Sequence, residues 1–146
     1  MGVATAVIHS VRLISSGQDH SGAFVAFADG RVVATGTGDG WRELAGDDAD
    51  VLDGEGLVLT PGLIDIHTHA GRSKEGPALL VQDGVTGWVD AGSAGADNIE
   101  QIATVARTGP QVGRALVNIA RTGVISPAGE LHDMNVANVA LAQGAI

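Results

Sequence analysis

Two histidines, His67 and His69, stand two residues apart at the end of an apolar segment that begins at Pro61. On a β-strand, residues i and i+2 point to the same face, whereas on a helix they would diverge by about 200°. Two imidazoles that converge at the end of a strand can hold one divalent metal ion. The alternative is a pair of polar histidines at the edge of a sheet, because a His-x-His pair often arises by chance.

Further polar side chains lie close to these histidines in the sequence. Asp65 shares the face of His67 but lies about 7 Å deeper along the strand. It could orient a histidine ring or make a purely structural hydrogen bond. Arg72 follows in the next loop, where it could pair with a substrate carboxylate or remain an exposed surface residue.

A second group of polar residues ends or follows the next predicted strand, and its members are candidates for substrate contact: Asp90, Ser93 and Asn98. Gly92 and Gly95 would let backbone amides approach a ligand. The alternative is ordinary turn chemistry with a helix cap at Asp97.

Residues 1–59 predict a small β-sheet domain. Apolar runs at residues 6–8, 11–14, 24–27 and 31–34 indicate strands, and Asp29-Gly30 between the last two predicts a hairpin turn. We expect residues 36–50 to form a loop that carries Trp41, followed by a strand at residues 51–53. His9 and His20 are expected on the surface of this domain.

From residue 60 to 146 the pattern alternates between strands and helices. We expect strands at 63–69, 85–90 and 115–120, a helix at 77–82, a helix that starts at Asp97 and ends at Gly109, and another from about Met134. This order is typical of βαβ units around a parallel sheet. Since a (β/α)₈ barrel needs about 250 residues, the segment predicts about three units of an incomplete α/β barrel.

The composition excludes several functional classes. The chain has 17 acidic and 8 basic residues and a net charge of -9, which argues against nucleic acid or an anionic membrane surface as partners. With no cysteine, any metal must bind His, carboxylate or a modified lysine. No apolar stretch approaches the roughly 20 residues of a membrane span, so a cytoplasmic location is expected.

Two sequence segments resemble a known superfamily. Residues 61–69, Pro-Gly-Leu-Ile-Asp-Ile-His-Thr-His, resemble the first barrel strand of the amidohydrolase superfamily. Residues 88–98, Trp-Val-Asp-Ala-Gly-Ser-Ala-Gly-Ala-Asp-Asn, resemble the second-strand segment of deacetylase-type metallohydrolases, a subgroup related to dihydroorotases and D-aminoacylases. The resemblance implies a (β/α)₈ barrel that follows a small, sandwich-like β-sheet domain.

The resemblance also implies a binuclear metal site, usually zinc, in which His67 and His69 bind the more buried ion. A carboxylated lysine and a catalytic aspartate are expected beyond Ile146; Lys74, the sole lysine, does not match, and His132 matches neither later metal histidine. The chain is therefore expected to be an N-terminal fragment without a complete active site, inactive alone and insoluble or oligomeric.

For the full-length protein, the resemblance implies hydrolysis of an amide or ester in a small acylated substrate by metal-activated hydroxide. One alternative is a cyclic amidohydrolase of the dihydroorotase or hydantoinase kind. Another is a non-catalytic assembly protein on the same scaffold, against which the presence of both His67 and His69 argues. A homo-oligomeric full-length protein is left open.

Overall fold

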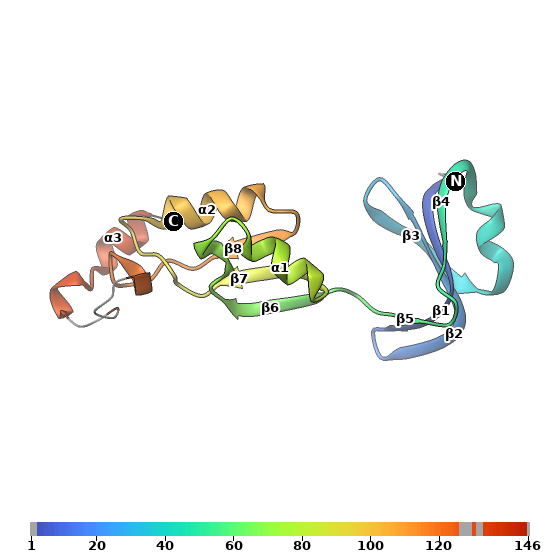
Figure 1. The fold of residues 1–146 in the computed structure, drawn as a ribbon, viewed down its shortest axis with the longest axis horizontal. Coiled ribbons are helices and arrows are strands. Elements are labelled where there is room, and N and C mark those ends of the chain that lie inside the picture. The colour runs from blue at the N-terminus through green and yellow to red at the C-terminus, as the bar shows by residue number, and fades with distance from the viewer. Residues whose placement is uncertain (1–2, 126–129, 131–132, 146) are drawn as a thin grey trace. The chain divides into compact units, whose positions relative to one another are not determined.

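The computed structural model describes residues 3–125, 130 and 133–145. The chain divides into two compact units, Met1–Pro61 and Gly62–Ile146. Each unit has its own β-sheet (Figure 1). That they fold as separate domains stays a prediction. His132 and part of the loop expected at residues 121–133 lie outside the described residues.

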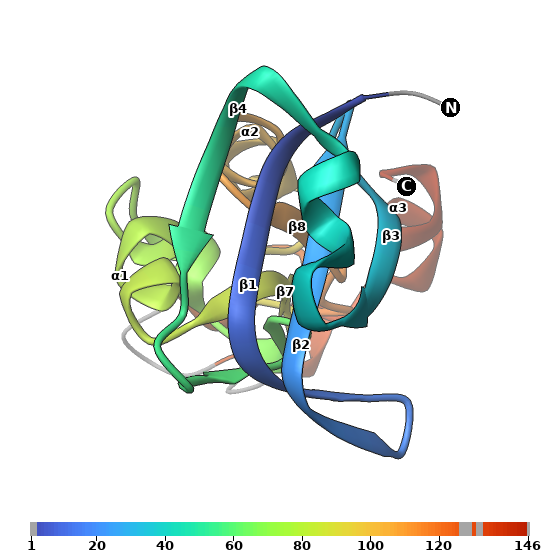
Figure 2. The same ribbon diagram turned by 90° about the vertical axis from the view of Figure 1, so that its right-hand side faces the viewer.

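The first unit is a five-stranded sheet of β1 (Ala4–Ser15), β2 (Gln18–Ala28), β3 (Arg31–Thr37), β4 (Ala45–Asp53) and β5 (Val58–Leu59). The order is β3-β2-β1-β4, with β5 also paired to β1. Strand β2 is antiparallel to its neighbours, whereas β4 and β5 run parallel to β1. Figure 2 shows β1 between β2 and β4.

The hairpin predicted at Asp29-Gly30 is confirmed. Both residues have positive φ, 51° and 70°, and they join β2 to β3. Two consecutive positive φ values match the twist of a tight hairpin.

The loop predicted for residues 36–50 is wrong at both ends. Strand β3 continues to Thr37, a 3-10 turn, η1 (Gly38–Glu43), places Trp41 in the core, and β4 starts at Ala45 instead of residue 51. The acidic segment disfavours a central strand, but β4 lies at the sheet edge, where its side chains face solvent and its backbone pairs with β1.

Trp41 also changes the environment expected for His9. The two rings stack with centroids 4.3 Å apart and planes 7° apart. Because the stack leaves only 15% of the His9 side chain exposed, the prediction of a surface residue is wrong for His9. His20 is exposed on β2, as expected.

The second unit contains a parallel sheet in the order β6-β7-β8, made of β6 (Leu63–Thr68), β7 (Val85–Asp90) and β8 (Val112–Ala115). Its helices are α1 (Gly76–Gln82), α2 (Ile99–Thr108) and α3 (Val139–Gly144), and its 3-10 turns are η2 (Ala70–Arg72), η3 (Gly123–Ile125) and η4 (Met134–Val136). Helices α1 and α2 connect successive strands (Figure 1).

Trp88 of β7 is the largest fully buried side chain, with 1% exposure. It packs so closely on β8 that a Cβ added at Gly113 would lie 2.7 Å from the indole.

The third strand is shifted from its predicted position. Strand β8 covers residues 112–115, because its partners on β7 are residues 87–90 and the pairing ends where β7 ends. Residues 116–120 continue with isolated bridges only, Gly95 to Asn118 and Ala120 to Ala137.

Two helix starts also differ from the expectation. Asp97 does not cap α2; its carboxylate accepts a hydrogen bond from Arg121 Nε at 2.8 Å, and the helix begins two residues later. The last helix begins at Val139, after η4, where the Asn138 side chain accepts a hydrogen bond from Leu141 N at 2.9 Å. Across the described ranges, no helix has the length and apolar character needed to cross a membrane.

Candidate metal centre at the end of strand β6

Strand β6 brings His67 and His69 to its carboxyl end. Both residues are exposed, and their ring centroids lie 6.0 Å apart with planes at 88°. Zinc binds histidine nitrogens at about 2.0–2.1 Å. The two imidazoles are donors that suit a divalent metal, and the assignment of His67 and His69 as ligands stays a prediction.

Hydrogen bonds fix the turn that follows these histidines. Thr68 Oγ1 accepts from Ala70 N at 3.2 Å, and Arg72 N donates to His69 O at 3.2 Å. The backbone of Thr68 also accepts a hydrogen bond from Ala91 N at 2.9 Å, which ties the end of β6 to the end of β7. Hydrogen bonds within the turn and to the end of β7 therefore fix the backbone at the candidate centre.

Asp65 makes a structural hydrogen bond. Its Oδ1 accepts from His67 N at 3.0 Å, a contact with the backbone of the histidine and not with its ring. Of the two alternatives for Asp65, this contact favours the structural one, and a role in orienting a ring stays a prediction.

The structure joins His69 to two buried residues that the sequence assigned to substrate contact or turn chemistry. His69 Nδ1 lies 2.7 Å from Ser93 Oγ. The Ser93 hydroxyl donates to Asp90 Oδ2 at 2.9 Å, and Ser93 N donates to Asp90 Oδ1 at 2.8 Å. Asp90 and Ser93 are both 0% exposed. Sequence reasoning missed this link; the Asp-x-x-Ser spacing at the end of β7 was the available signal.

Asn98 stabilises the loop after β7. Its Oδ1 accepts from Gly95 N at 3.0 Å, and its Nδ2 donates to Thr122 O at 3.1 Å. Arg72 is exposed at the end of η2. These contacts show internal hydrogen bonding for Asp90, Ser93 and Asn98, so substrate contact by these residues and by Arg72 stays a prediction.

No third ligand joins the two histidines within residues 3–125, 130 and 133–145, since no group of three His, Cys, Asp or Glu side chains there could hold a metal. Catalytic zinc sites commonly use three protein ligands plus water. Lys74, the sole lysine, is exposed. The carboxylated lysine and the catalytic aspartate expected beyond Ile146 stay predictions.

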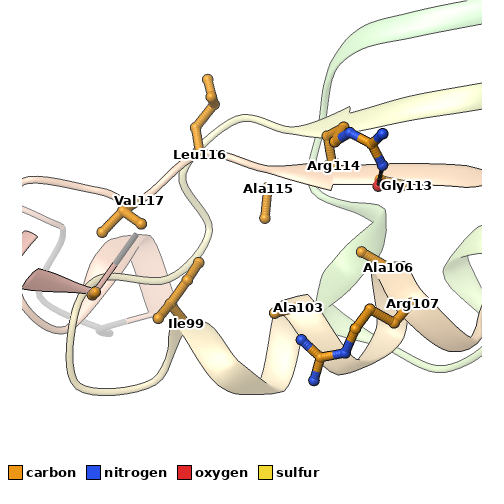
Figure 3. Close-up of a pocket in the computed structure, with 10 residues that line it drawn as sticks. Ile99, Ala103, Ala106, Arg107, Gly113, Arg114, Ala115, Leu116 and Val117 are labelled. Carbon is orange, nitrogen blue, oxygen red and sulfur yellow. Dashed lines mark hydrogen bonds between the residues drawn. The ribbon is translucent and has the colours of Figure 1, made fainter. Parts of the chain in front are cut away.

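A hollow of about 400 Å³ lies elsewhere in this unit, between α2 and β8 (Figure 3). Its lining is mostly apolar and includes Ile99, Ala103, Leu116 and Val117. Neither His67 nor His69 lines it. Because its walls lack metal ligands or a nucleophile, this hollow is not the candidate centre.

Comparison with known proteins gives sequence matches over part of the chain. No family model matches. Imidazolonepropionases from Streptococcus sanguinis and Streptococcus gordonii are each 43% identical over 54 residues, which are 36% of this chain and 13% of each relative. The match therefore spans a small part of the relatives' length.

Solved structures share the fold over almost the whole chain. An adenine deaminase aligns with a TM-score of 0.76 and 24% identity over 98% of this chain and 38% of its own. A dihydroorotase aligns with a TM-score of 0.77 and 19% identity over 96% and 38%.

The predicted fold class is confirmed. The chain has the α/β architecture of the amino-terminal part of an α/β barrel, preceded by a small sheet, and the described residues contain no closed barrel. Part of the sequence is thus similar to imidazolonepropionases, and the fold is similar to that of an adenine deaminase and a dihydroorotase.

Proposed function

We propose that this chain supplies the first metal ligands of a metal-dependent hydrolase that cleaves an amide or ester bond in a small acylated substrate. The observation that carries the proposal is the pair His67 and His69 at the carboxyl end of the first parallel strand. Barrel enzymes build their active sites at this end of the sheet.

His67 and His69 would bind a divalent ion, most simply zinc, through ring nitrogens. Such an ion, when bound, generates hydroxide from water near neutral pH and polarises the carbonyl under attack. The chain's own residues hold and orient the ligands: β6 aligns both rings, and Ser93 contacts His69. A carboxylated lysine and a proton-shuttling aspartate of the full-length protein complete the proposed centre.

The nature of the substrate distinguishes two candidate functions. The resemblance of residues 88–98 to deacetylase-type metallohydrolases supports an N-acyl or O-acyl compound. The sequence match to imidazolonepropionases supports a cyclic amide as the second candidate, because that name specifies an imidazolone ring. A homo-oligomeric assembly and a cytoplasmic location stay predictions for the full-length protein.

The test uses the full-length protein and three variants: His67→Ala, His69→Ala and the control His20→Ala, which removes an exposed histidine of β2. We expect about two zinc-like ions per subunit in the wild type and the control, as in two-metal hydrolases. Each ligand variant should lose metal and hydrolysis of a panel of N-acetyl, O-acetyl and cyclic amide compounds. Unchanged metal content in both ligand variants would refute the ligand assignment.

A further inference from the structure

We propose that Asp90 and Ser93 act as positioning residues that fix the orientation and the tautomer of His69. The buried carboxylate would act through the Ser93 hydroxyl and leave Nε2 of His69 free to bind a metal. The metal-binding part of this inference rests on the proposed function, whereas the tautomer itself does not.

The direction of the hydrogen bonds carries the argument. An ionised carboxylate only accepts hydrogen bonds, and Asp90 accepts two from Ser93, one from the backbone N–H and one from the hydroxyl. A hydroxyl has a single hydrogen, so Ser93 Oγ has only lone pairs to offer His69 at 2.7 Å. His69 Nδ1 must therefore carry the hydrogen of that contact, and in a neutral ring Nε2 then keeps its lone pair.

Close packing keeps the relay, the hydrogen-bonded series Asp90, Ser93 and His69, in this arrangement. A Cβ added at Gly71 would lie 2.9 Å from Asp90 Oδ2, and one added at Gly123 would lie 2.3 Å from Ser93 O. The same Ser93 carbonyl accepts a hydrogen bond from Val124 N at 3.1 Å. Gly71 thus packs on the Asp90 carboxylate, Gly123 and Val124 fix the Ser93 backbone, and the 0% exposure of both residues limits alternative rotamers.

A turn alone would not require this chain of contacts. The bond from Ser93 N to Asp90 already closes the turn after β7, and the hydroxyl bonds to Asp90 and His69 come in addition. The exposed His69 is thereby linked, through Ser93, to a carboxylate that is itself 0% exposed. Metal-binding histidines commonly donate their other ring N–H to such a partner, which sets the tautomer and raises the basicity of the ligand nitrogen.

The sharpest test is Asp90→Asn, which should reverse the direction of the hydrogen bonds that link residue 90, Ser93 and His69. The carbonyl oxygen of the substituted side chain would keep the bond from Ser93 N, so the amide N–H of that side chain would point at Ser93 Oγ. The hydroxyl would then donate to His69 Nδ1, and the neutral ring would carry its hydrogen on Nε2. The equivalent change at a catalytic aspartate beside histidine is known to leave the imidazole in the wrong tautomer.

The measurement is the long-range ¹H–¹⁵N spectrum of the histidine-labelled full-length protein without metal at about pH 8.5, where imidazole rings are neutral. We expect the Nδ1–H tautomer of His69 in the wild type, in Ser93→Thr and in the control Ser21→Ala, which removes an exposed hydroxyl of β2. Asp90→Asn should show the Nε2–H tautomer, and Ser93→Ala a mixture of the two.

Zinc titration of the same samples gives a second, independent readout. Asp90→Asn and Ser93→Ala should weaken zinc binding about 10- to 100-fold, as loss of a ligand's hydrogen-bond partner does elsewhere, and Ser21→Ala should not. An Nε2–H tautomer in the wild type would overturn the proposal even if every variant failed to fold. A correct tautomer pattern with no zinc binding would instead overturn the proposed function and leave the relay in place.

Discussion

The two units of this chain differ in the polar side chains that they bury. The Met1–Pro61 unit buries an apolar cluster of Ala4, Val7, Phe24, Ala26 and Trp41, and its Arg12–Asp19 ion pair is exposed. The Gly62–Ile146 unit buries the polar pair Asp90 and Ser93 and exposes aliphatic side chains of β6, with Ile64 68% and Ile66 74% exposed.

This contrast separates a structural role from a functional one. Burying a carboxylate costs free energy unless hydrogen bonds compensate, and Asp90 accepts two from Ser93, whose hydroxyl also contacts the His69 ring. Apolar residues on both faces of β6 are typical of a strand that helices and strands cover in an α/β barrel. The first unit therefore has the features of a structural module, and the second has those of a site.

The largest effect should come from removing the main core side chain of either unit. Trp88→Ala should destabilise the second unit by about 3–5 kcal/mol, and Phe24→Ala the first by a similar amount, because each leaves a large cavity. If the units fold as separate domains, amide exchange should rise only in the unit that carries the change. Equal loss of protection in both units would show a single cooperative fold.

The contrast in polar burial predicts a second, smaller effect. Asp90→Ala removes the acceptor for two buried donors of Ser93 and should cost about 1–3 kcal/mol in urea unfolding. Asp19→Ala breaks only the exposed pair with Arg12 and should change stability far less. A cost for Asp19→Ala that equals or exceeds the cost for Asp90→Ala would remove the distinction between the units.

The hairpin of the first unit gives a third prediction. Gly30 has φ of 70°, so Gly30→Ala should destabilise that unit by about 1 kcal/mol, because a side chain is strained in the left-handed region. Asp29→Gly, at the neighbouring positive φ, relieves such strain and is the matched control. Thermal melts in which both variants lose the same stability would contradict this explanation.

The smallest effect concerns pH and the surface of α2. A hydrogen bond from Arg107, followed by its charge, lowers the pKa of Glu100 from its ordinary value of 4.5. A lowered folded-state pKa gives stability that is present above about pH 4.5 and is lost as the pH falls through the folded pKa. Melting temperatures of wild type and Glu100→Gln should differ slightly at about pH 7, since exposed pairs contribute little, and should converge in acid once the pH lies below the folded-state pKa. A gap that widened in acid would reverse the predicted sign.

Much of this arrangement could be predicted from the sequence, because local patterns decide it. Alternating strands and helices indicated the parallel sheet, and Asp29-Gly30 indicated the hairpin. The start of β4 could not be predicted, because Asp47, Asp48 and Asp50 disfavour a strand and only pairing with β1 stabilises one. Likewise, Asp97 looked like a helix cap until the fold brought Arg121 beside it.

The candidate site shows the same limit. The spacing of His67 and His69 predicted their convergence on a strand, which is a local property. The link from His69 to Ser93 and Asp90 depends on the pairing of β6 with β7, a contact between residues 24 positions apart. Spacing alone therefore identified the candidate ligands but not the residues that hold them.

The most direct test of the central claim is zinc-edge X-ray absorption on the zinc-loaded full-length protein. We predict imidazole scattering at a zinc–nitrogen distance of about 2.0–2.1 Å in the wild type. A His67→Ala/His69→Ala variant loaded with the same metal should lose part of that histidine contribution or retain less zinc. Identical spectra and equal zinc content in the two proteins would contradict a metal centre at the end of β6.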